Sequence, residues 1–485
     1  MECERACTTV STNQRRVEMD LSNIYNIQKN YFLRENTLSV SFRKQQLKKL
    51  YEAINRYEDA IVDALKKDLG KSREESYMSE IGMVKSEISH MLKHVSSYAK
   101  RHYVPSPLAQ FVSVSYTKAV PYGVTLIMSP WNYPFLLTLD PLVCAIASGD
   151  TAVLKPSPAS PFTNQVMKKI ISENFDESYI TLVEGGIEEA NILLEQPFDF
   201  VFFTGGSQTG KIVNMKCAEH LTPCILELGG KSPCIVDESA DIDLSAKRIV
   251  FGKFLNCGQT CVAPDYVLVH RSKKDALIQA LQNEIVKQYG EHPLTSDIYG
   301  KIIHPGQFER IRKMMDPDKI VYGGTCDEKA CKIEPAIMDD VTWDDSVMQE
   351  EIFGPLLPVL TYDDFDEMMD TLKTKPHPLA FYLFTKNKKH IQKMDTEMIF
   401  GGGCINDTII HLASNYLGFG GVGNSGMGKY HGKDGFDAFS HTKSIVDKKC
   451  IIDLAMRYAP YENAFYSKLI RFFMKGKEEV LASSF

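Results

Sequence analysis

The chain contains the stretch Asn256-Cys257-Gly258-Gln259-Thr260-Cys261-Val262-Ala263-Pro264, in which three residues separate two cysteines. A helix is predicted before it, over residues 245–255, and an apolar run, residues 266–269, follows it. Such a tight connection of small residues can turn the Cys261 thiol and a backbone amide toward the same cavity. Free cysteines are most often small core fillers, so this stretch alone does not establish any chemistry.

Length and composition are those of an ordinary globular protein with more than one domain. A chain of 485 residues is too long for a single hydrophobic core, which predicts two or three domains. A hydrophobic content of 44% and a charged content of 24% are typical of globular proteins rather than of disordered chains. A formal net charge of −7 argues against nucleic-acid binding, which needs a basic face.

Cysteine usage and the start of the chain favour a cytoplasmic protein. Residues 1–20 form a polar leader without the apolar core of a secretory signal, and Met19 is an alternative start. The 12 cysteines follow no framework spacing, so they are expected to be reduced thiols. The 257/261 and 326/331 pairs lack the His or Cys partners of a zinc site, and no metal site is predicted. No run of ~18 apolar residues predicts a membrane-spanning helix.

The first third of the chain predicts two helices and one strand. Residues 37–69 repeat apolar side chains at helical spacing and end at Gly70, which predicts a long amphipathic helix. A second helix is predicted over residues 76–100. Residues 110–120 alternate apolar and polar side chains, as in a strand with one exposed side, and have no evident local partner. Two alternatives stay open for this strand, pairing across a subunit boundary or an internal hairpin.

From Gly123 onward, short apolar runs alternate with helical segments. This order predicts doubly wound, mostly parallel α/β sheets, because strands buried on both faces are apolar throughout. The runs fall into two series, so we predict two α/β domains with a boundary near residues 228–230. The runs are residues 124–128, 151–154, 180–183 and 200–203 in the first series, and 232–236, 266–269 and 356–360 in the second.

A glycine-rich loop, Gly205-Gly206-Ser207-Gln208-Thr209-Gly210-Lys211, follows one of these runs and precedes a predicted helix. Free amides at such a helix N-terminus can bind phosphate. The loop nearly matches the phosphate loop of nucleoside triphosphatases, but Ile212 stands where that loop needs Ser or Thr, which argues against an ATP-using enzyme. The G-x-G-x-x-G fingerprint is absent as well. A diphosphate-bearing cofactor is expected here, with a plain tight turn as the alternative.

Four further polar residues have unusual neighbours, namely Asn132, Lys155, Glu227 and Glu351. Each alone can be explained as a cap, a turn residue or a solvated side chain. With Cys261 they outline one reaction, in which a thiolate attacks a carbonyl carbon, an amide donor stabilises the oxyanion and a carboxylate acts as base. With a dinucleotide nearby, the adduct can lose hydride to leave a thioester, which activated water then releases as an acid.

Five motifs stand in order along the chain: Pro-Trp-Asn-Tyr-Pro at 130–134, Glu-Leu-Gly-Gly-Lys at 227–231, Asn-Cys-Gly-Gln-Thr-Cys at 256–261, Glu-Ile-Phe-Gly-Pro at 351–355 and Phe-Gly-Gly-Val-Gly-Asn-Ser-Gly-Met-Gly at 419–428. Together they resemble the aldehyde dehydrogenases, in particular the class 3 branch, and the resemblance extends from Tyr31 past Ser444. It implies an aldehyde dehydrogenase-like α/β fold, with two doubly wound domains and a small β oligomerisation arm. The implied division is a dinucleotide-binding domain over 1–105 and 120–226, a catalytic domain over 227–410, and an arm with a C-terminal tail over 106–119 and 411–485.

The resemblance also implies a role for each candidate residue. Cys261 would be the nucleophile, Glu227 the general base, and the Asn132 side chain with the Cys261 amide the oxyanion hole. The cofactor, NAD or NADP, would contact Gly205, Gly206, Ser207 and Gly210 with its diphosphate, Lys155 with its adenosine ribose, and Glu351 and Phe353 at its nicotinamide end. Cys257 would be a structural or accessory thiol.

The implied activity is the oxidation of apolar aliphatic or aromatic aldehydes to carboxylic acids. An acyl-CoA-forming or catalytically silent member of the same fold is the alternative, and the presence of Glu227 favours release of a free acid. Tyr133 and residues 411–417 are expected near the mouth of the substrate pocket.

Two departures from the family pattern bear on the cofactor. Family members commonly carry Glu where this chain has Pro158, three positions after Lys155, and that Glu grips the ribose 2′-hydroxyl. Because a carboxylate there would repel a 2′-phosphate, its loss admits NADP, and the use of both cofactors is predicted. Gly206 stands where Ser is common, which removes one hydroxyl donor to the diphosphate and weakens binding by about 0.5–1.5 kcal/mol.

The end of the chain predicts a short basic amphipathic helix. Its apolar residues include Phe465, Leu469, Ile470, Phe472 and Phe473, and its basic residues are Lys468, Arg471, Lys475 and Lys477. Packing over a neighbouring subunit or over the substrate mouth is the favoured interpretation, and peripheral contact with an anionic membrane is the alternative. A homodimer is expected, from the strand at 110–120 and from the resemblance.

Overall fold

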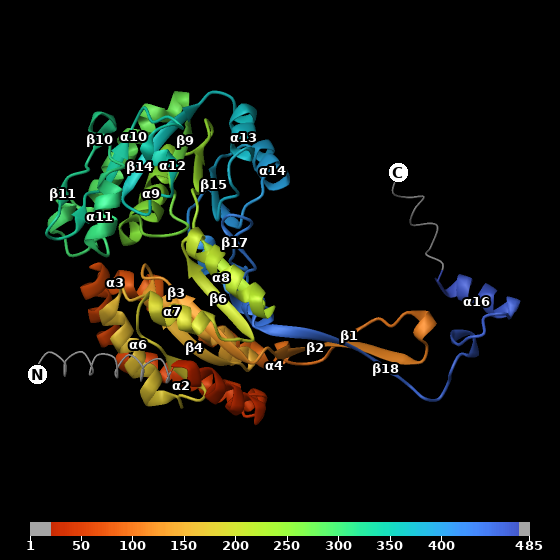
Figure 1. Ribbon diagram of the computed structural model, residues 1–485. Helices are drawn as coiled ribbons and strands as arrows, with labels where there is room; N and C mark the ends of the chain where they lie inside the picture. The colour runs from red at the N-terminus through yellow and green to blue at the C-terminus, as the bar shows by residue number, and fades with distance from the viewer. Residues whose placement is uncertain (1–20, 475–485) are drawn as a thin grey trace, which may run out of the picture.

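The computed structural model describes residues 21–474 (Figure 1). The predicted polar leader with its alternative start, and the last two lysines of the predicted tail helix, lie outside the described residues. Two separate sheets lie in two α/β layers, and a narrow β arm leads away from them to the C-terminal helix (Figure 1).

The first sheet has six strands in the order β17-β7-β6-β3-β4-β5. All of its pairs are parallel except β17 with β7. Leu126 and Val201 belong to the apolar cluster on one face, while Ile127 and Phe202 belong to the cluster on the other, which confirms the predicted doubly wound sheet. The strands are β3 (Val124–Ser129), β4 (Thr151–Pro156), β5 (Ile180–Leu182), β6 (Phe200–Gly205), β7 (Cys224–Leu228) and β17 (Gly426–Met427).

Helices cover both faces of the first sheet. The longest, α2 (Val40–Leu69), begins where the Ser39 side chain accepts a hydrogen bond from the Phe42 amide and ends at Gly70, which has a φ of 70°. The others are α4 (Gly82–Tyr98), α5 (Pro134–Ser148), α6 (Pro161–Asn174), α7 (Ile187–Leu194), α8 (Ser207–His220) and α15 (Gly432–Ala438).

The helix predicted over residues 76–100 is more irregular than expected. It begins as α3 (Arg73–Ser76), because the Ser72 side chain accepts from the Glu75 amide and caps a turn there. A π-helical turn, η1 (Tyr77–Ile81), then joins α3 to α4. π-Helical turns are rare and occur frequently at functional sites.

The second sheet has seven strands in the order β10-β13-β14-β9-β8-β15-β16, and only β10 is antiparallel to its neighbour. The chain crosses from the first sheet to the second between Leu228 and Pro233, near the predicted boundary. The strands are β8 (Pro233–Val236), β9 (Tyr266–His270), β10 (Ile320–Tyr322), β13 (Ala336–Met338), β14 (Leu356–Tyr362), β15 (Ala380–Phe384) and β16 (Gly402–Ile405). The helices and the small β11–β12 hairpin are α9 (Ile242–Phe254), α10 (Lys274–Tyr289), α11 (Pro305–Arg312), α12 (Ser346–Gln349), α13 (Phe365–Lys373), α14 (Lys388–Glu397), β11 (Cys326–Asp327) and β12 (Lys332–Ile333).

The arm is a three-stranded antiparallel sheet in which β2 (Ser113–Pro121) lies between β1 (His102–Val104) and β18 (Ser440–Lys448). The strand predicted over residues 110–120 is therefore paired on both edges within the chain, as the internal-hairpin alternative expected. Its longer partner, β18, comes more than 300 residues later, and its local partner, β1, has only 3 residues, so neither partner was evident from the sequence.

Two segments lie outside the units to which they were assigned. Residues 426–427 were placed with the arm and tail, but β17 joins the first sheet because Gly426 and Met427 pair with Glu227 and Leu226. Helix α15 of the same region packs against α4 and α5. Conversely, β1 was placed in the dinucleotide-binding domain and belongs to the arm sheet.

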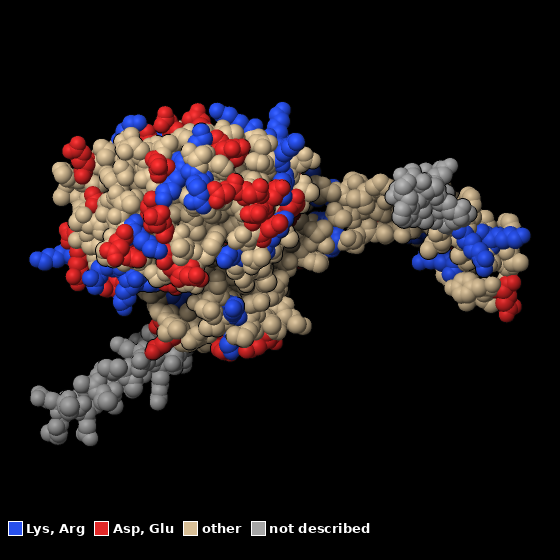
Figure 2. Space-filling view, turned by 90° about the horizontal axis from the view of Figure 1, so that it is seen from above, with Lys and Arg blue, Asp and Glu red and all other residues tan. Residues whose placement is uncertain are grey.

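The chain beyond the arm forms a short 3₁₀ turn, η8 (Ala455–Arg457), and the helix α16 (Ala464–Met474). No residue of α16 is buried, and Phe465 and Phe472 are exposed. Figure 2 shows acidic and basic side chains mixed over the visible face of the two α/β layers, whereas basic side chains gather on the tail. Among the described residues, none of the helices is both long enough and apolar enough to cross a membrane.

Candidate active site

A cavity of about 710 Å³ lies between the two sheets and is lined by residues from both. The first sheet contributes residues at the carboxyl ends of β3, β6 and β7, where ligands bind in open α/β sheets. The second contributes the turn that carries Cys261 and the loop that carries Glu351 and Phe353. Seven of the ten predicted site residues line this cavity: Asn132, Gly205, Gly206, Glu227, Cys261, Glu351 and Phe353.

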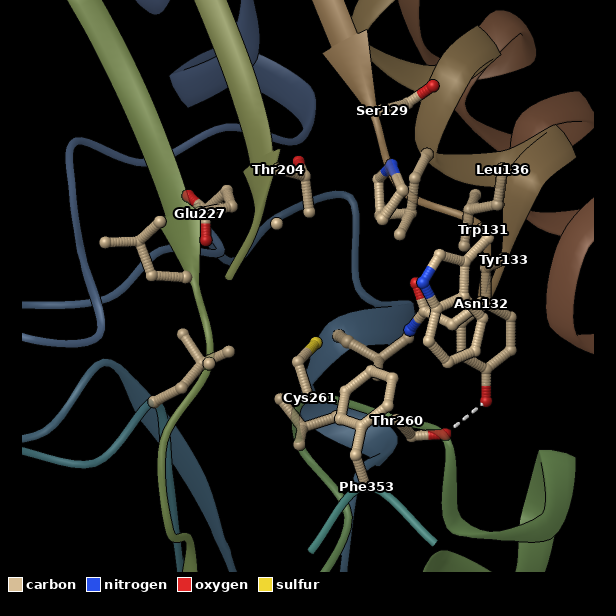
Figure 3. A pocket seen from close by; sticks show the side chains of 18 of the residues that line it. Ser129, Trp131, Asn132, Tyr133, Leu136, Thr204, Glu227, Thr260, Cys261 and Phe353 are labelled. Carbon is tan, nitrogen blue, oxygen red and sulfur yellow. Dashed lines mark hydrogen bonds between the residues drawn. The ribbon is translucent and has the colours of Figure 1, made fainter. Parts of the chain in front are cut away.

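Cys261 is half-buried and its sulfur faces the cavity (Figure 3). The turn before it is tight, since Asn256 and Cys257 both have left-handed φ angles, 52° and 53°. Cys257 is only 2% exposed and belongs to the apolar core of the second sheet, so it does not reach the cavity. The two cysteines therefore have different surroundings, although they belong to one short motif.

The Cys261 thiol is neutral in this state. Burial, followed by the nearby carboxyl groups of Glu351 and Glu227, raises its pKa to about 12. A cation bound beside the sulfur would lower this pKa and favour the thiolate.

Glu227 lies on β7, on the side of the cavity opposite Cys261 (Figure 3). It is 3% exposed, and neither carboxyl oxygen has a hydrogen-bond partner among the described residues. Burial raises the pKa of Glu227 well above its ordinary value, because it disfavours the charged form of the carboxyl. A buried acid with a perturbed pKa in a cavity is typical of a proton-transfer group.

Asn132 lies on the turn between β3 and α5, and Figure 3 shows its side chain close to Cys261. Its Nδ2 donates one hydrogen bond to the Gln259 carbonyl oxygen, at 3.0 Å. A side-chain amide has two N–H donors, so the second is left for another acceptor. Next to it, the Tyr133 hydroxyl is bonded to Thr260 Oγ1 at 2.6 Å. Neighbouring residues of the two sheets are thus joined directly at the cavity.

The glycine loop places the N-terminus of α8 at the cavity. Gly205 ends β6 and Gly206 caps α8, and a Cβ on Gly206 would meet no atom within 4 Å. Free amides beside open space fit an anionic diphosphate. Ser207 and Gly210 do not line the cavity, because the Ser207 hydroxyl bonds the Asn424 carbonyl at 3.4 Å and Gly210 packs against Leu228.

Lys155 does not line the cavity either. It lies near the carboxyl end of β4 and is 4% exposed, and its Nζ donates to the carbonyl oxygens of Gly185, at 2.7 Å, and Pro156, at 3.2 Å. Burial lowers the pKa of this ammonium. An ammonium has three donors, so one is left for a ligand hydroxyl.

Glu351 and Phe353 lie on the loop that follows α12. Burial is the largest cause that raises the pKa of Glu351, to about 8, and a hydrogen bond from the Gly230 amide opposes it. The Phe353 ring meets the Trp131 ring edge to face, with 5.5 Å between centroids. Both residues line the cavity, and Figure 3 shows Phe353 next to Cys261.

Some lining residues were not predicted from the sequence. Met78, Ser79 and Met83 come from the π-helical turn and the start of α4, a region that reads as plain amphipathic helix. Of the residues expected near the mouth, Tyr133, Leu412 and Ala413 line the cavity, and their place at its mouth stays a prediction. No local signal identifies Met78 or Met83, because only the contact between distant segments places them there.

Comparison with known proteins agrees with this geometry. The sequence model described as the aldehyde dehydrogenase family matches residues 6–445. This chain belongs to that family. The aldehyde dehydrogenase is 42% identical to aldehyde dehydrogenase family 3 member H1 of Arabidopsis thaliana, over 88% of this chain and 89% of the relative. It is 41% identical to the dimeric NADP-preferring aldehyde dehydrogenase of Rattus norvegicus, over 87% of this chain and 94% of the relative.

Among solved structures, the substrate-bound state of Staphylococcus aureus AldH is similar, with a TM-score of 0.92 and 46% identity. The match covers 93% of this chain and 99% of that one. The predicted fold and the predicted resemblance to class 3 aldehyde dehydrogenases are confirmed, and the protein is an oxidoreductase. The roles of individual residues stay predictions.

Proposed function

We propose that the protein oxidises apolar aliphatic or aromatic aldehydes to carboxylic acids with NAD or NADP. The observation that carries this proposal is the placement of a half-buried Cys261 and a buried, unpartnered Glu227 on opposite walls of one cavity (Figure 3). The α8 N-terminus and Glu351 lie at the same cavity and would hold the diphosphate and the nicotinamide ribose. When bound, the cofactor supplies the hydride acceptor and a cationic ring.

The first covalent step joins the Cys261 sulfur to the aldehyde carbon. The thiol proton leaves, the C–S bond forms, and the carbonyl π electrons move to oxygen. The free N–H of Asn132 and the Cys261 amide would donate to that oxygen, where they are worth most because the site is buried. Loss of hydride from the same carbon leaves a thioester.

Glu227 acts in the second half of the reaction. As a carboxylate, it would take a proton from water while the water oxygen attacks the thioester carbon. The C–S bond then breaks, the acid leaves, and the thiol regains a proton. The net change is aldehyde, oxidised cofactor and water to acid, reduced cofactor and one proton. The raised pKa of Glu227 suits a group that alternately holds and releases a proton.

Glu227→Gln tests this assignment. The amide keeps the shape of the side chain but cannot accept the proton, so acyl-enzyme should accumulate: a burst of reduced cofactor followed by slow turnover. Steady-state turnover equal to that of the parent enzyme would refute the role of Glu227. Release of an acyl-CoA when coenzyme A is added, without free acid, would support the acyl-CoA-forming alternative. Failure of the parent enzyme to reduce any cofactor would support a silent protein.

The substrate class follows from the cavity wall away from the glycine loop. That wall is mainly apolar and aromatic, and an apolar wall favours apolar ligands. It is made by Met78, Met83, Tyr133, Leu136, Leu137, Ile409, Ile410, Leu412, Phe419 and Tyr430. The test is reduced-cofactor formation across a series of aldehydes of increasing chain length, with Cys261→Ala as the inactive control. A kcat/KM that falls with each added methylene would contradict the proposal.

Use of both cofactors is proposed from Pro158, which presents no carboxylate to a 2′-phosphate. The buried Lys155 ammonium, with one donor left, supplies a nearby cation. The name of the rat relative, NADP-preferring, supports NADP as an admissible cofactor. The ratio of kcat/KM for NAD and NADP tests this, and a preference for NAD above ~100-fold, ~2.7 kcal/mol, would exclude dual use.

We also propose a homodimer, a cytoplasmic location and the domain division given above, amended by the positions of β17 and β1. The name of the rat relative, dimeric, supports the first of these. The cysteines of the described residues are all free thiols, which fits a reducing compartment. For α16 we propose packing on protein rather than on membrane. Deletion from Ala464 onward should leave liposome pelleting unchanged, and a loss of pelleting would favour the membrane.

A further inference from the structure

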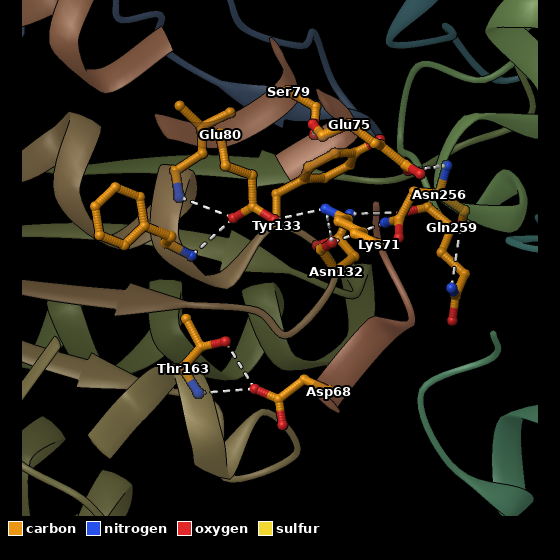
Figure 4. Close-up of polar contacts among 12 residues, drawn as sticks. Asp68, Lys71, Glu75, Ser79, Glu80, Asn132, Tyr133, Thr163, Asn256 and Gln259 are labelled. Carbon is orange, nitrogen blue, oxygen red and sulfur yellow. Dashed lines mark hydrogen bonds and ion pairs between the residues drawn. The ribbon is translucent and has the colours of Figure 1, made fainter. Parts of the chain in front are cut away.

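The segment between α2 and α4, residues 71–80, lies beside the cavity and lines it with Met78 and Ser79; we call this segment the bracket. Three of its side chains reach the loops that carry Asn132 and Cys261 (Figure 4). They are Lys71, Glu75 and Glu80, and none of them lines the cavity. Any effect they have on catalysis must therefore pass through other residues.

Lys71 and Glu80, the first and last residues of the bracket, both contact the loop that carries Asn132 and the start of α5. Both side chains are fully buried, and Lys71 Nζ lies 2.5 Å from Glu80 Oε1. The other Glu80 oxygen accepts from the Phe135 and Leu136 amides, at 2.9 and 3.2 Å, in the first turn of α5. A carboxylate is favourable at a helix N-terminus. Lys71 Nζ also lies 3.4 Å from the Asn132 carbonyl oxygen.

Glu75, in the middle of the bracket, contacts the turn that precedes Cys261. Its Oε1 accepts from the Asn256 amide at 2.8 Å, at the first of two consecutive left-handed residues. Such a backbone is strained for non-glycine residues and persists only where the surroundings hold it. The hydrogen bond to the Glu75 carboxylate is one of the contacts that stabilise this backbone conformation.

Asn256 connects Glu75 to the residues that line the cavity. Its Nδ2 donates to the Asn132 carbonyl oxygen at 2.7 Å and to the Gln259 carbonyl oxygen at 3.2 Å. The Gln259 carbonyl is also the acceptor that orients the Asn132 side chain. The two side-chain amides thus share one acceptor, the Gln259 carbonyl oxygen, and Asn256 also binds the Asn132 main chain, so a shift of one loop moves the amide on the other.

We propose that Glu75 is a positioning residue. Through Asn256, it fixes the position of the Asn132 side-chain amide relative to the Cys261 sulfur. The inference rests on the proposed function, in which this amide and this sulfur act on the same carbonyl group. A displacement of about 1 Å at a reacting group can lower a rate by about 100-fold. The hydrogen bond to the Asn256 amide, rather than the charge on Glu75, is the feature that matters.

A matched pair of variants separates the hydrogen bond from the charge. Glu75→Gln keeps an oxygen acceptor at the same reach and loses the charge. Glu75→Asp keeps the charge but is shorter by one C–C bond, ~1.5 Å, and loses the contact. Glu74→Gln is the control, because Glu74 is exposed on the same helix, α3.

The expected result is a kcat 10- to 100-fold lower for Glu75→Asp, with KM within ~3-fold of the parent enzyme because Glu75 does not line the cavity. Glu75→Gln and Glu74→Gln should stay within ~3-fold in both constants. If Glu75→Gln is the more impaired of the two, the charge acts and the proposal is overturned. It is also overturned if Glu75→Asp lowers Tm but leaves the kcat of folded enzyme unchanged.

A second readout does not depend on aldehyde oxidation. The rate at which iodoacetamide alkylates Cys261, followed by mass spectrometry of its peptide, should change at least threefold in Glu75→Asp and match the parent enzyme in the other two variants. If the parent enzyme oxidised no aldehyde, the proposed function would fail, yet the order of alkylation rates would still decide whether Glu75 positions the turn.

Discussion

Glu351 occupies the space in which a side chain at Gly229 would lie: a Cβ on Gly229 would come within 2.0 Å of Glu351 Oε2. The two residues belong to different motifs, and Gly229 follows the last strand of the first sheet's parallel core. A glycine at this position therefore lets the Glu351 carboxyl reach the cavity wall.

Gly229→Ala should displace Glu351 and weaken cofactor binding. Overpacking of this kind costs about 1–3 kcal/mol, so we expect a Kd for NADH roughly 5- to 150-fold higher, measured by the fluorescence of the reduced nucleotide. Gly230→Ala is the matched control, because a Cβ on Gly230 meets no atom within 4 Å. Equal affinities for the two variants would contradict the contact.

Gly206→Ser should tighten cofactor binding. A Cβ on Gly206 meets nothing within 4 Å, and the added hydroxyl can donate to the diphosphate. One hydrogen bond is worth about 0.5–1.5 kcal/mol, so Kd should fall roughly 2- to 12-fold. Gly210→Ala, in contrast, would bring a Cβ within 2.5 Å of Leu228 Cδ2 and should lower Tm. An unchanged Kd for Gly206→Ser would place the diphosphate elsewhere.

Alkylation of Cys261 without cofactor should depend steeply on pH. Because burial and the two nearby carboxyl groups raise its pKa to about 12, the thiolate fraction rises roughly tenfold per pH unit up to that value. Iodoacetamide rates between pH 7 and 10, measured on the Cys261 peptide, check this. A plateau below pH 9 would show that the thiol ionises more easily than its surroundings imply.

Glu227→Gln should stabilise the fold at higher pH. The pKa of Glu227 is raised in the folded state and lies near 4.3 in the unfolded chain. The folded state therefore binds the proton more tightly, and this stability is full below about pH 4 and is lost as the pH rises toward the folded pKa. Gln does not titrate. The difference in free energy of unfolding between Glu227→Gln and the parent enzyme should therefore grow, in favour of the variant, by up to about 1.4 kcal/mol for each unit by which the pH rises. Denaturant unfolding at pH 5.5 and 8 measures it, and a pH-independent difference would contradict the sign.

Cys257→Ala should behave as a core substitution. The side chain is 2% exposed among apolar neighbours of the second sheet, so we expect a loss of about 1 kcal/mol in stability and kcat within ~3-fold. Cys261→Ala should do the reverse, abolishing turnover with little change in Tm. Loss of turnover in both would mean that Cys257 has a chemical role.

Sequence patterns predicted the parallel strands well where both faces are buried. The run at 200–203 is apolar throughout because Val201 and Phe202 face opposite clusters. These patterns did not predict the partners of residues 110–120, because β18 is more than 300 residues away and the nearby β1 is too short to show a periodic pattern. The π-helical turn was missed for a similar reason, as helical periodicity does not distinguish it from an α-helix.

The candidate site was predictable to the extent that its chemistry lies in short motifs. Asn132, Glu227 and Cys261 were identified by residue type and line one cavity. Glu75 and Glu80 carry no local signal, because their partners lie 181 and 55 residues away. Lys155 shows a different limit. The sequence predicts that it lies at the end of a strand, but not that two main-chain carbonyl oxygens accept hydrogen bonds from its ammonium group.

The loops that carry Asn132 and Asn256 belong to different sheets and are joined by a hydrogen bond, so the active site cannot form before both sheets have been synthesised. Each sheet by itself holds half of the reactive centre, so a nascent chain or a proteolytic fragment that contains one sheet has a thiol without its amide, or an amide without its thiol. The chain therefore becomes catalytically active only after the two sheets have packed together, and separation of the sheets abolishes activity.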